Sequence, residues 1–174
     1  NSLLLHISGT HGPEGYAGSA IQRAYLNSIK KRDNKKSKND IKNRPTEIFV
    51  HALNPYGFDQ NRRVNEDNID LNRNFLTEDE FKFAISRDPN FANYINMDGL
   101  FNPSPASLFT NNRYINLLLL LIKSLYYSFT NDMVSIKRAM VSGNYHNPNG
   151  LYYGGTKMSN SASKLIEFLT EYMN

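Results

Sequence analysis

Hydrophobic and polar positions follow two different periods along the first sixty residues of the chain. Residues 3–8 carry an aliphatic run, which predicts a buried strand. Residues 13–29 open with a proline and a glutamate in the first turn, and this start predicts a helix. The alternation over residues 47–53 predicts a second strand, which the Asn-Pro-Tyr-Gly segment 54–57 should end. This order of elements indicates an α/β fold.

Helical periods dominate the remainder of the chain. We predict helices over residues 77–86, 113–130, 133–141 and 159–172, with Thr77 capping the first of them. Three prolines within residues 87–111 predict a long loop, and residues 143–155 form a glycine-rich loop. The aromatic side chains of the 113–130 helix are expected to serve packing. No internal repeat or domain boundary is visible, so we predict a single domain over residues 1–174.

Composition excludes several classes of site. The chain has no cysteine, which excludes disulfides, thiolate nucleophiles and Cys-ligated zinc. Any metal must therefore be held by His, Asp or Glu. The absence of cysteine also favours a cytoplasmic location. The longest apolar run, Leu117 to Ile122, is far shorter than the roughly 20 residues of a membrane span, so we expect no membrane partner.

The positive charge is concentrated in one segment. Residues 30–44 hold eight basic and two acidic side chains, so this segment carries +6 while the rest of the chain carries −2 of the net +4. A Lys- and Asn-rich segment with one aliphatic residue predicts a solvated basic insertion, which we place at residues 30–45. An electrostatic docking site is the alternative. Because no aromatic residues are interleaved with the basic ones, we expect no nucleic-acid partner.

His11 and Glu14 stand three residues apart, just beyond the carboxyl end of the first predicted strand. Open α/β sheets place their ligand sites at this end of the strands. The spacing across a turn into a helix can bring an imidazole and a carboxylate onto one ion, and zinc accepts both ligands. In the alternative interpretation Glu14 is only a helix-start carboxylate and His11 a polar loop residue.

A second stretch, NPYGFDQNRRVNEDNIDLNRNF, concentrates Arg62, Arg63 and Arg73 together with Asn72 and Asn74. The planar guanidinium group grips a carboxylate through two hydrogen bonds. Close to a zinc site, one arginine could orient a substrate carboxylate and another could oppose a developing oxyanion. The alternative is a charged surface loop with its own ion pairs.

Three motifs occur in order over most of the chain: SGTHGPEG, NPYGF…RRVNEDN.DLNRNF and GNYHNPNGLYYGG. Together they resemble the zinc carboxypeptidase-like family of the carboxypeptidase A superfamily, and more narrowly one branch of carboxypeptidase-like proteins. The resemblance implies an α/β fold with a mixed, mostly parallel sheet flanked by helices. It also implies a Zn²⁺ cofactor and a peptide substrate with a free carboxylate, cleaved by metal-activated water.

The resemblance assigns roles to individual residues. It implies that His11 and Glu14 are zinc ligands and that Arg63 is the catalytic arginine facing the oxyanion, although Arg62 stands where the family has tryptophan. It implies that Asn72 and Arg73 hold the terminal carboxylate of the substrate. The sequence therefore predicts a zinc-dependent metallopeptidase site.

The family also needs a third histidine ligand and a glutamate that acts as general base. His146 lies 132 residues after Glu14 and is a candidate ligand, whereas His6 and His51 fall in predicted strands as core or supporting residues. The branch carries its third ligand in an Asp-x-His-Thr-Gly stretch after the glycine-rich segment, and this chain has none before Asn174. We therefore expect both groups to be encoded after Asn174. The chain would be an N-terminal and central fragment of the domain, inactive and weakly zinc-binding when alone.

Two alternatives remain open. Zinc N-deacylases of the aspartoacylase and succinylglutamate desuccinylase type are similar in their Gly-Thr-His-Gly-x-Glu opening and Asp-Leu-Asn-Arg segment, and they would take an acyl-amino-acid substrate. A catalytically inactive binding remnant would keep the fold and hold acidic ligands with the arginine-rich loop.

Overall fold

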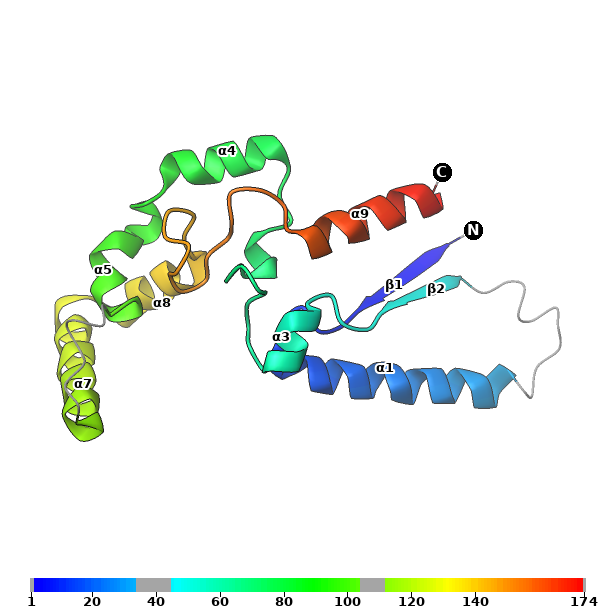
Figure 1. Cartoon of the computed structure of the whole chain (residues 1–174), viewed down its shortest axis with the longest axis horizontal. Helices are drawn as coiled ribbons and strands as arrows, with labels where there is room; N and C mark the ends of the chain where they lie inside the picture. The colour runs from blue at the N-terminus through cyan, green and yellow to red at the C-terminus, as the bar shows by residue number, and fades with distance from the viewer. Residues whose placement is uncertain (1, 34–44, 104–111, 174) are drawn as a thin grey trace. The chain divides into compact units, whose positions relative to one another are not determined.

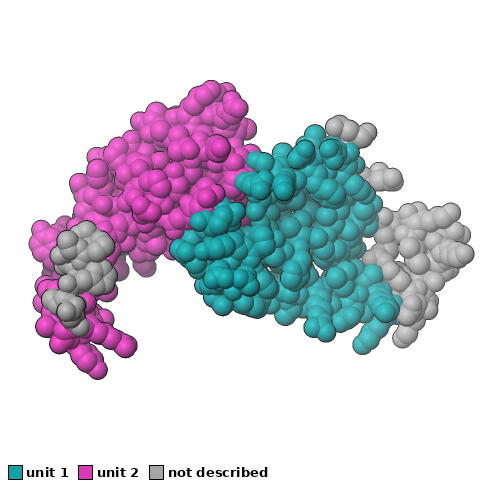
Figure 2. Space-filling view, in the orientation of Figure 1, with its two compact units in different colours: residues 1–66, 160–174 teal, residues 67–159 magenta. Residues whose placement is uncertain are grey.

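The computed structural model describes residues 2–33, 45–103 and 112–173. The chain forms two compact units, which Figure 2 shows in different colours. Unit 1 comprises Asn1–Glu66 together with Asn160–Asn174, and unit 2 comprises Asp67–Ser159. Each unit has its own helices and its own buried side chains.

Unit 1 is built around a small parallel sheet. It contains β1 (Leu3–Ile7), α1 (Gly12–Asp33), β2 (Thr46–Val50), α3 (Pro55–Gln60) and α9 (Asn160–Met173), as Figure 1 shows. The strands pair in parallel, with Leu3 opposite Thr46 and Ile7 opposite Val50. Both predicted strands form, but β1 is not buried as predicted, because Leu3, Leu4 and Ile7 are 36–42% exposed. Pairing continues past the strands, because the Ser8 amide donates to the Val50 carbonyl at 2.9 Å.

The segment after β2 differs from its prediction. We expected residues 54–57 only to end the strand, but they also begin α3. The Asn54 side chain accepts from the Gly57 amide, and Pro55 occupies the first turn of the helix. An asparagine cap followed by proline is a helix-start signal, since proline has no amide to leave unsatisfied there.

Unit 2 is helical among its described residues. It contains η1 (Leu71–Arg73), α4 (Glu78–Arg87), η2 (Phe91–Asn93), α5 (Tyr94–Phe101), α7 (Arg113–Thr130) and α8 (Met133–Ser142). Met97, Ile136 and Ala139 form a buried cluster that joins α5 to α8. The predicted cap of α4 is confirmed: Thr77 and Glu80 exchange hydrogen bonds in a capping box.

Two predictions in unit 2 were wrong. Residues 87–111, predicted as a loop, include η2 and α5, because burial of Tyr94 and Met97 stabilises a helix between the prolines; residues 104–111 lie outside the described part. The aromatic residues of α7 do not all serve packing, since Tyr114 is 80% exposed and Phe129 is 88% exposed.

The fold is therefore α/β, mostly helical, with one two-stranded parallel sheet in the described residues. The larger mixed sheet implied by the resemblance is not found there.

Most of the predicted basic insertion, residues 34–44, lies outside the described residues. Its first residues form the last turn of α1, where their positive charge suits the negative end of the helix dipole. Over the same described ranges, no helix combines the length and apolarity needed to cross a membrane.

Candidate metal site

His11 and Glu14 lie where β1 gives way to α1 in unit 1. The His11 Nδ1 atom is 3.7 Å from the Glu14 Oε1 atom. The His11 side chain is only 10% exposed, whereas the Glu14 side chain is 65% exposed. The pair therefore consists of an imidazole fixed in the fold and a carboxylate that solvent, an ion or a ligand can reach.

This separation fits two ligands of one zinc ion. Donor atoms about 2.0–2.1 Å from the same ion lie about 3.4 Å apart at the tetrahedral angle and at most about 4.2 Å apart. The observed 3.7 Å falls between these limits. One imidazole nitrogen and one carboxylate oxygen are also donors that zinc accepts. Across the described residues, however, no group of three His, Cys, Asp or Glu side chains is assembled for a metal.

Arg63 adds a positive charge to the pair. Its Nη1 atom is 3.8 Å from the Glu14 Oε1 atom, and its side chain is 33% exposed. The backbone brings it there, because the Gly12 amide donates to the Arg62 carbonyl at 2.9 Å. The structure thus brings together three of the residues that the sequence predicted for the site.

Two glycines allow this close approach. A Cβ atom at Gly12 would lie 1.7 Å from the Gly57 carbonyl oxygen, so only glycine lets the start of α1 meet α3. Gly9 has φ +66°, and a Cβ there would lie 2.9 Å from the Ala52 Cα atom. The glycines around His11 are therefore required by the backbone geometry of the site.

Asn54 is a supporting residue that the sequence analysis did not identify. Its side chain is fully buried and accepts from the Gly57 amide at 2.8 Å. Its amide nitrogen lies 3.5 Å from the Thr10 carbonyl and 3.4 Å from the Arg63 carbonyl, to which it donates. Asn54 therefore links three backbone segments around the site. The sequence does carry a signal for Asn54, because an asparagine directly before a proline is a typical helix cap.

Asn72 and Arg73 belong to unit 2. Asp70, fully buried, caps η1 by accepting from the Asn72 amide, and the Asn72 side chain is exposed. The Arg73 Nη2 atom donates to the Val141 carbonyl at 2.5 Å, and its Nη1 donates to the Asn72 carbonyl at 3.3 Å. Among the residues that the structure describes, none accepts a hydrogen bond from the buried Nε–H of Arg73. A buried donor in this state is costly unless water or a ligand supplies an acceptor.

His146 also lies in unit 2, where it pairs with a buried carboxylate. Its Nδ1 atom contacts the Asp88 Oδ2 atom, and the Asp88 side chain is 4% exposed. The Tyr145 amide donates to the same oxygen at 2.9 Å. Burial raises the pKa of the Tyr145 phenol, whose hydroxyl donates to the Arg73 carbonyl at 2.8 Å. These contacts anchor the glycine-rich loop to the segment between α4 and η2.

The two histidines near the sheet have local partners of their own. The His6 ring stacks on Phe49 at 4.6 Å and its Nε2 atom lies 3.8 Å from the Glu47 Oε2 atom. His51 follows β2, is exposed, and shares a 2.7 Å hydrogen bond with the Ser19 hydroxyl. His6 thus lies in a strand as predicted, whereas His51 lies just outside one.

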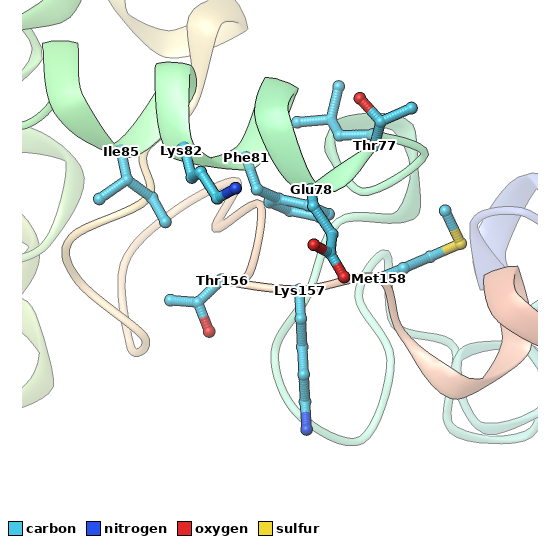
Figure 3. A pocket seen from close by; sticks show the side chains of 9 residues that line it. Thr77, Glu78, Phe81, Lys82, Ile85, Thr156, Lys157 and Met158 are labelled. Carbon is cyan, nitrogen blue, oxygen red and sulfur yellow. The ribbon is translucent and has the colours of Figure 1, made fainter.

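A pocket in unit 2 is separate from all of these predicted residues. It has a volume of about 520 Å³, and Figure 3 shows α4 on one side and residues 156–158 on the other. Phe81 and Ile85 give it an apolar wall, while Lys82 and Lys157 contribute positive charge. It contains no histidine, so it is not a second metal site of the same chemistry.

Comparison with known proteins identifies one family. The sequence model described as "Protein of unknown function (DUF2817)" matches residues 1–174. No curated protein and no solved structure matches the chain significantly.

Proposed function

This chain belongs to the DUF2817 family, and we propose that it carries part of the active site of a zinc-dependent, carboxypeptidase-like hydrolase. The proposed reaction is cleavage of a peptide or amide bond close to a free carboxylate. The larger mixed sheet of such a hydrolase would include strands other than β1 and β2.

One observation carries the proposal: an imidazole nitrogen and a carboxylate oxygen lie 3.7 Å apart at the end of a strand, with a guanidinium group beside them. His11 and Glu14 would hold the zinc ion. The third ligand and the general base would come from outside the described residues. When bound, zinc polarises a carbonyl group and lowers the pKa of a bound water to roughly 7.

The arginines would provide the positive charge that the reaction needs. Arg63, 3.8 Å from Glu14, would face the oxygen on which negative charge develops. Asn72 and Arg73 would hold the substrate carboxylate, a role that rests on the resemblance of the Asp-Leu-Asn-Arg-Asn segment. Tyr145 remains a neutral hydrogen-bond donor to the Arg73 backbone, since burial raises its pKa.

Calorimetric titration of the full chain with Zn²⁺ tests the ligands. We expect weak binding of one ion, and His11→Ala or Glu14→Gln should each lower the affinity by more than about 10-fold. His51→Ala is the matched control, because this histidine of the same unit hydrogen-bonds Ser19 and should not affect zinc affinity. The proposal fails if zinc does not bind, or if both site variants bind it as tightly as the wild type.

Two other functions make different predictions for turnover and for ligand binding. A zinc N-deacylase would turn over N-acyl amino acids faster than peptides with a free carboxyl terminus. A binding remnant would hold acidic ligands equally well after treatment with a chelator. The longer Arg-Arg-Val-Asn-Glu-Asp-Asn stretch favours the peptidase over the deacylase, so peptide turnover that a chelator abolishes is the expected result.

A further inference from the structure

Helix α7 turns its polar side toward the rest of unit 2. Asn116, Lys123, Ser124 and Tyr127 are its half-buried residues, and none of its eighteen side chains is fully buried. A Cβ atom built on Gly99 of α5 would lie 2.9 Å from the Tyr127 hydroxyl and 3.7 Å from the Lys123 Nζ atom. The polar face of α7 therefore lies against α5.

The opposite face of α7 is apolar and exposed. Eight large hydrophobic side chains on it are each more than half exposed: Tyr114, Leu117, Leu118, Leu121, Ile122, Leu125, Tyr126 and Phe129. Their spacing alternates between three residues and one, which places them on one side of a helix. Figure 1 shows α7 extending away from α5 and α8. Exposed apolar areas of this extent mark interaction surfaces.

The order of these eight residues is symmetric about the middle of the helix. Counting outward from the midpoint between Leu121 and Ile122, the pairs are Leu121 with Ile122, Leu118 with Leu125, Leu117 with Tyr126, and Tyr114 with Phe129. Leucine and isoleucine thus lie at the centre and an aromatic residue lies at each end. In a two-fold antiparallel pair of helices, each residue meets the residue at the mirrored position of the other copy.

We propose that this face of α7 is an interface with a second copy of this chain, in which the two α7 helices pair antiparallel. None of the eight side chains is charged, and Lys123 points toward α5, so pairing opposes no like charges. Each Leu, Ile or Phe that becomes buried removes roughly 60–120 Å² of apolar surface from water. Scaled by their exposed fractions of 53–88%, the eight residues remove roughly 300–600 Å² of apolar surface on each copy, which approaches the roughly 600 Å² per partner at the lower end of stable interfaces.

Charge favours a second copy over a lipid surface. Helices that lie in a membrane interface carry lysine and arginine along the face opposite the apolar one, where they contact the headgroups. In α7 that face lies against α5, and its charged residues are only Arg113 and Lys123. A membrane partner would therefore bury the apolar face without the accompanying electrostatic attraction.

Sedimentation of the full chain and of three variants tests the interface. We expect the wild type to sediment as a dimer, and Leu118→Glu or Leu125→Glu to raise the dimer dissociation constant by more than about 100-fold, because each change occurs twice in a two-fold interface. Phe83→Glu on α4 is the matched control: Phe83 is 64% exposed and lies outside α7, so this variant should remain dimeric. Far-UV circular dichroism verifies that all variants keep their helices.

Engineered cysteines test the antiparallel register, because the chain has no cysteine of its own. In the proposed pair, position 118 meets position 125 of the second copy, while the two copies of position 118 are about 10 Å apart along the axis. A mixture of Leu118→Cys and Leu125→Cys chains should therefore form a disulfide-linked dimer under mild oxidation, and either chain alone should not.

Four results would overturn the proposal. The first is a wild-type chain that is monomeric at every soluble concentration. The second is loss of the dimer in Phe83→Glu to the same degree as in Leu118→Glu. The third is binding of the monomer to vesicles that contain phosphatidylserine, abolished by Leu118→Glu, which would assign the face to a lipid surface. Cross-linking of Leu118→Cys alone would replace the antiparallel register with a parallel one.

Discussion

Replacing Asn74 by alanine should destabilise unit 2, although this residue lies in the arginine-rich motif. The Asn74 side chain is fully buried. Its amide nitrogen donates to the Gly154 and Lys157 carbonyls, each at 2.9 Å, and its oxygen accepts from the Ser159 amide at 2.6 Å. At about 0.5–1.5 kcal/mol for each hydrogen bond, Asn74→Ala should cost about 2–4 kcal/mol of the free energy of unfolding.

Urea unfolding followed by far-UV circular dichroism measures this loss, and hydrogen exchange locates it. We expect the amides of residues 154–159 to exchange faster, because Asn74 holds this segment in place. Asn72→Ala is the control: the Asn72 side chain is exposed, so its removal should change stability by less than about 0.5 kcal/mol. Equal stability of Asn74→Ala and Asn72→Ala would refute the assignment of Asn74 as a structural tether.

Four further predictions concern other parts of the chain. Thr77→Ala removes the cap of α4 and should cost about 1 kcal/mol in thermal unfolding, whereas Thr77→Ser should cost little. The Thr77 amide and hydroxyl, which donate to Glu80, lower the pKa of that carboxyl. The ionised Glu80 carboxylate therefore stabilises the folded state at pH values above the ordinary pKa of glutamate, and this stabilisation is lost as pH falls through the lowered pKa of Glu80. Glu80→Gln cannot ionise, so the free energy of unfolding of this variant should lose that contribution to its dependence on acid pH. Gly12→Ala places a Cβ atom 1.7 Å from the Gly57 oxygen and should lower both stability and zinc affinity; an unchanged melting temperature would contradict the close approach. Under the proposed function, Arg63→Ala should reduce kcat for peptide cleavage by about 100- to 1,000-fold while zinc affinity remains within a few-fold of the wild type.

Local sequence signals determined most of the elements. The aliphatic run of β1, the capping box that starts α4 and the long apolar repeat of α7 are signals carried by neighbouring residues, and each element formed where it was predicted. The pairing of His11 with Glu14 is likewise local, since a spacing of three at the start of a helix is enough to bring the two side chains together.

Tertiary contacts decided what local patterns could not. The capping role of Asn54 is a local signal, but its contact with the Thr10 carbonyl and the contacts of Asn74 involve carbonyl groups that are distant in sequence, so no local window reveals them. Helix α5 forms because Met97 becomes buried against α8 and Tyr94 against the glycine-rich loop, where its hydroxyl donates to the Leu151 carbonyl. The sequence by itself determined which residues of α7 share an apolar face. Only the tertiary structure decided that this face points away from unit 2, because an amphipathic pattern specifies a face without specifying what covers it.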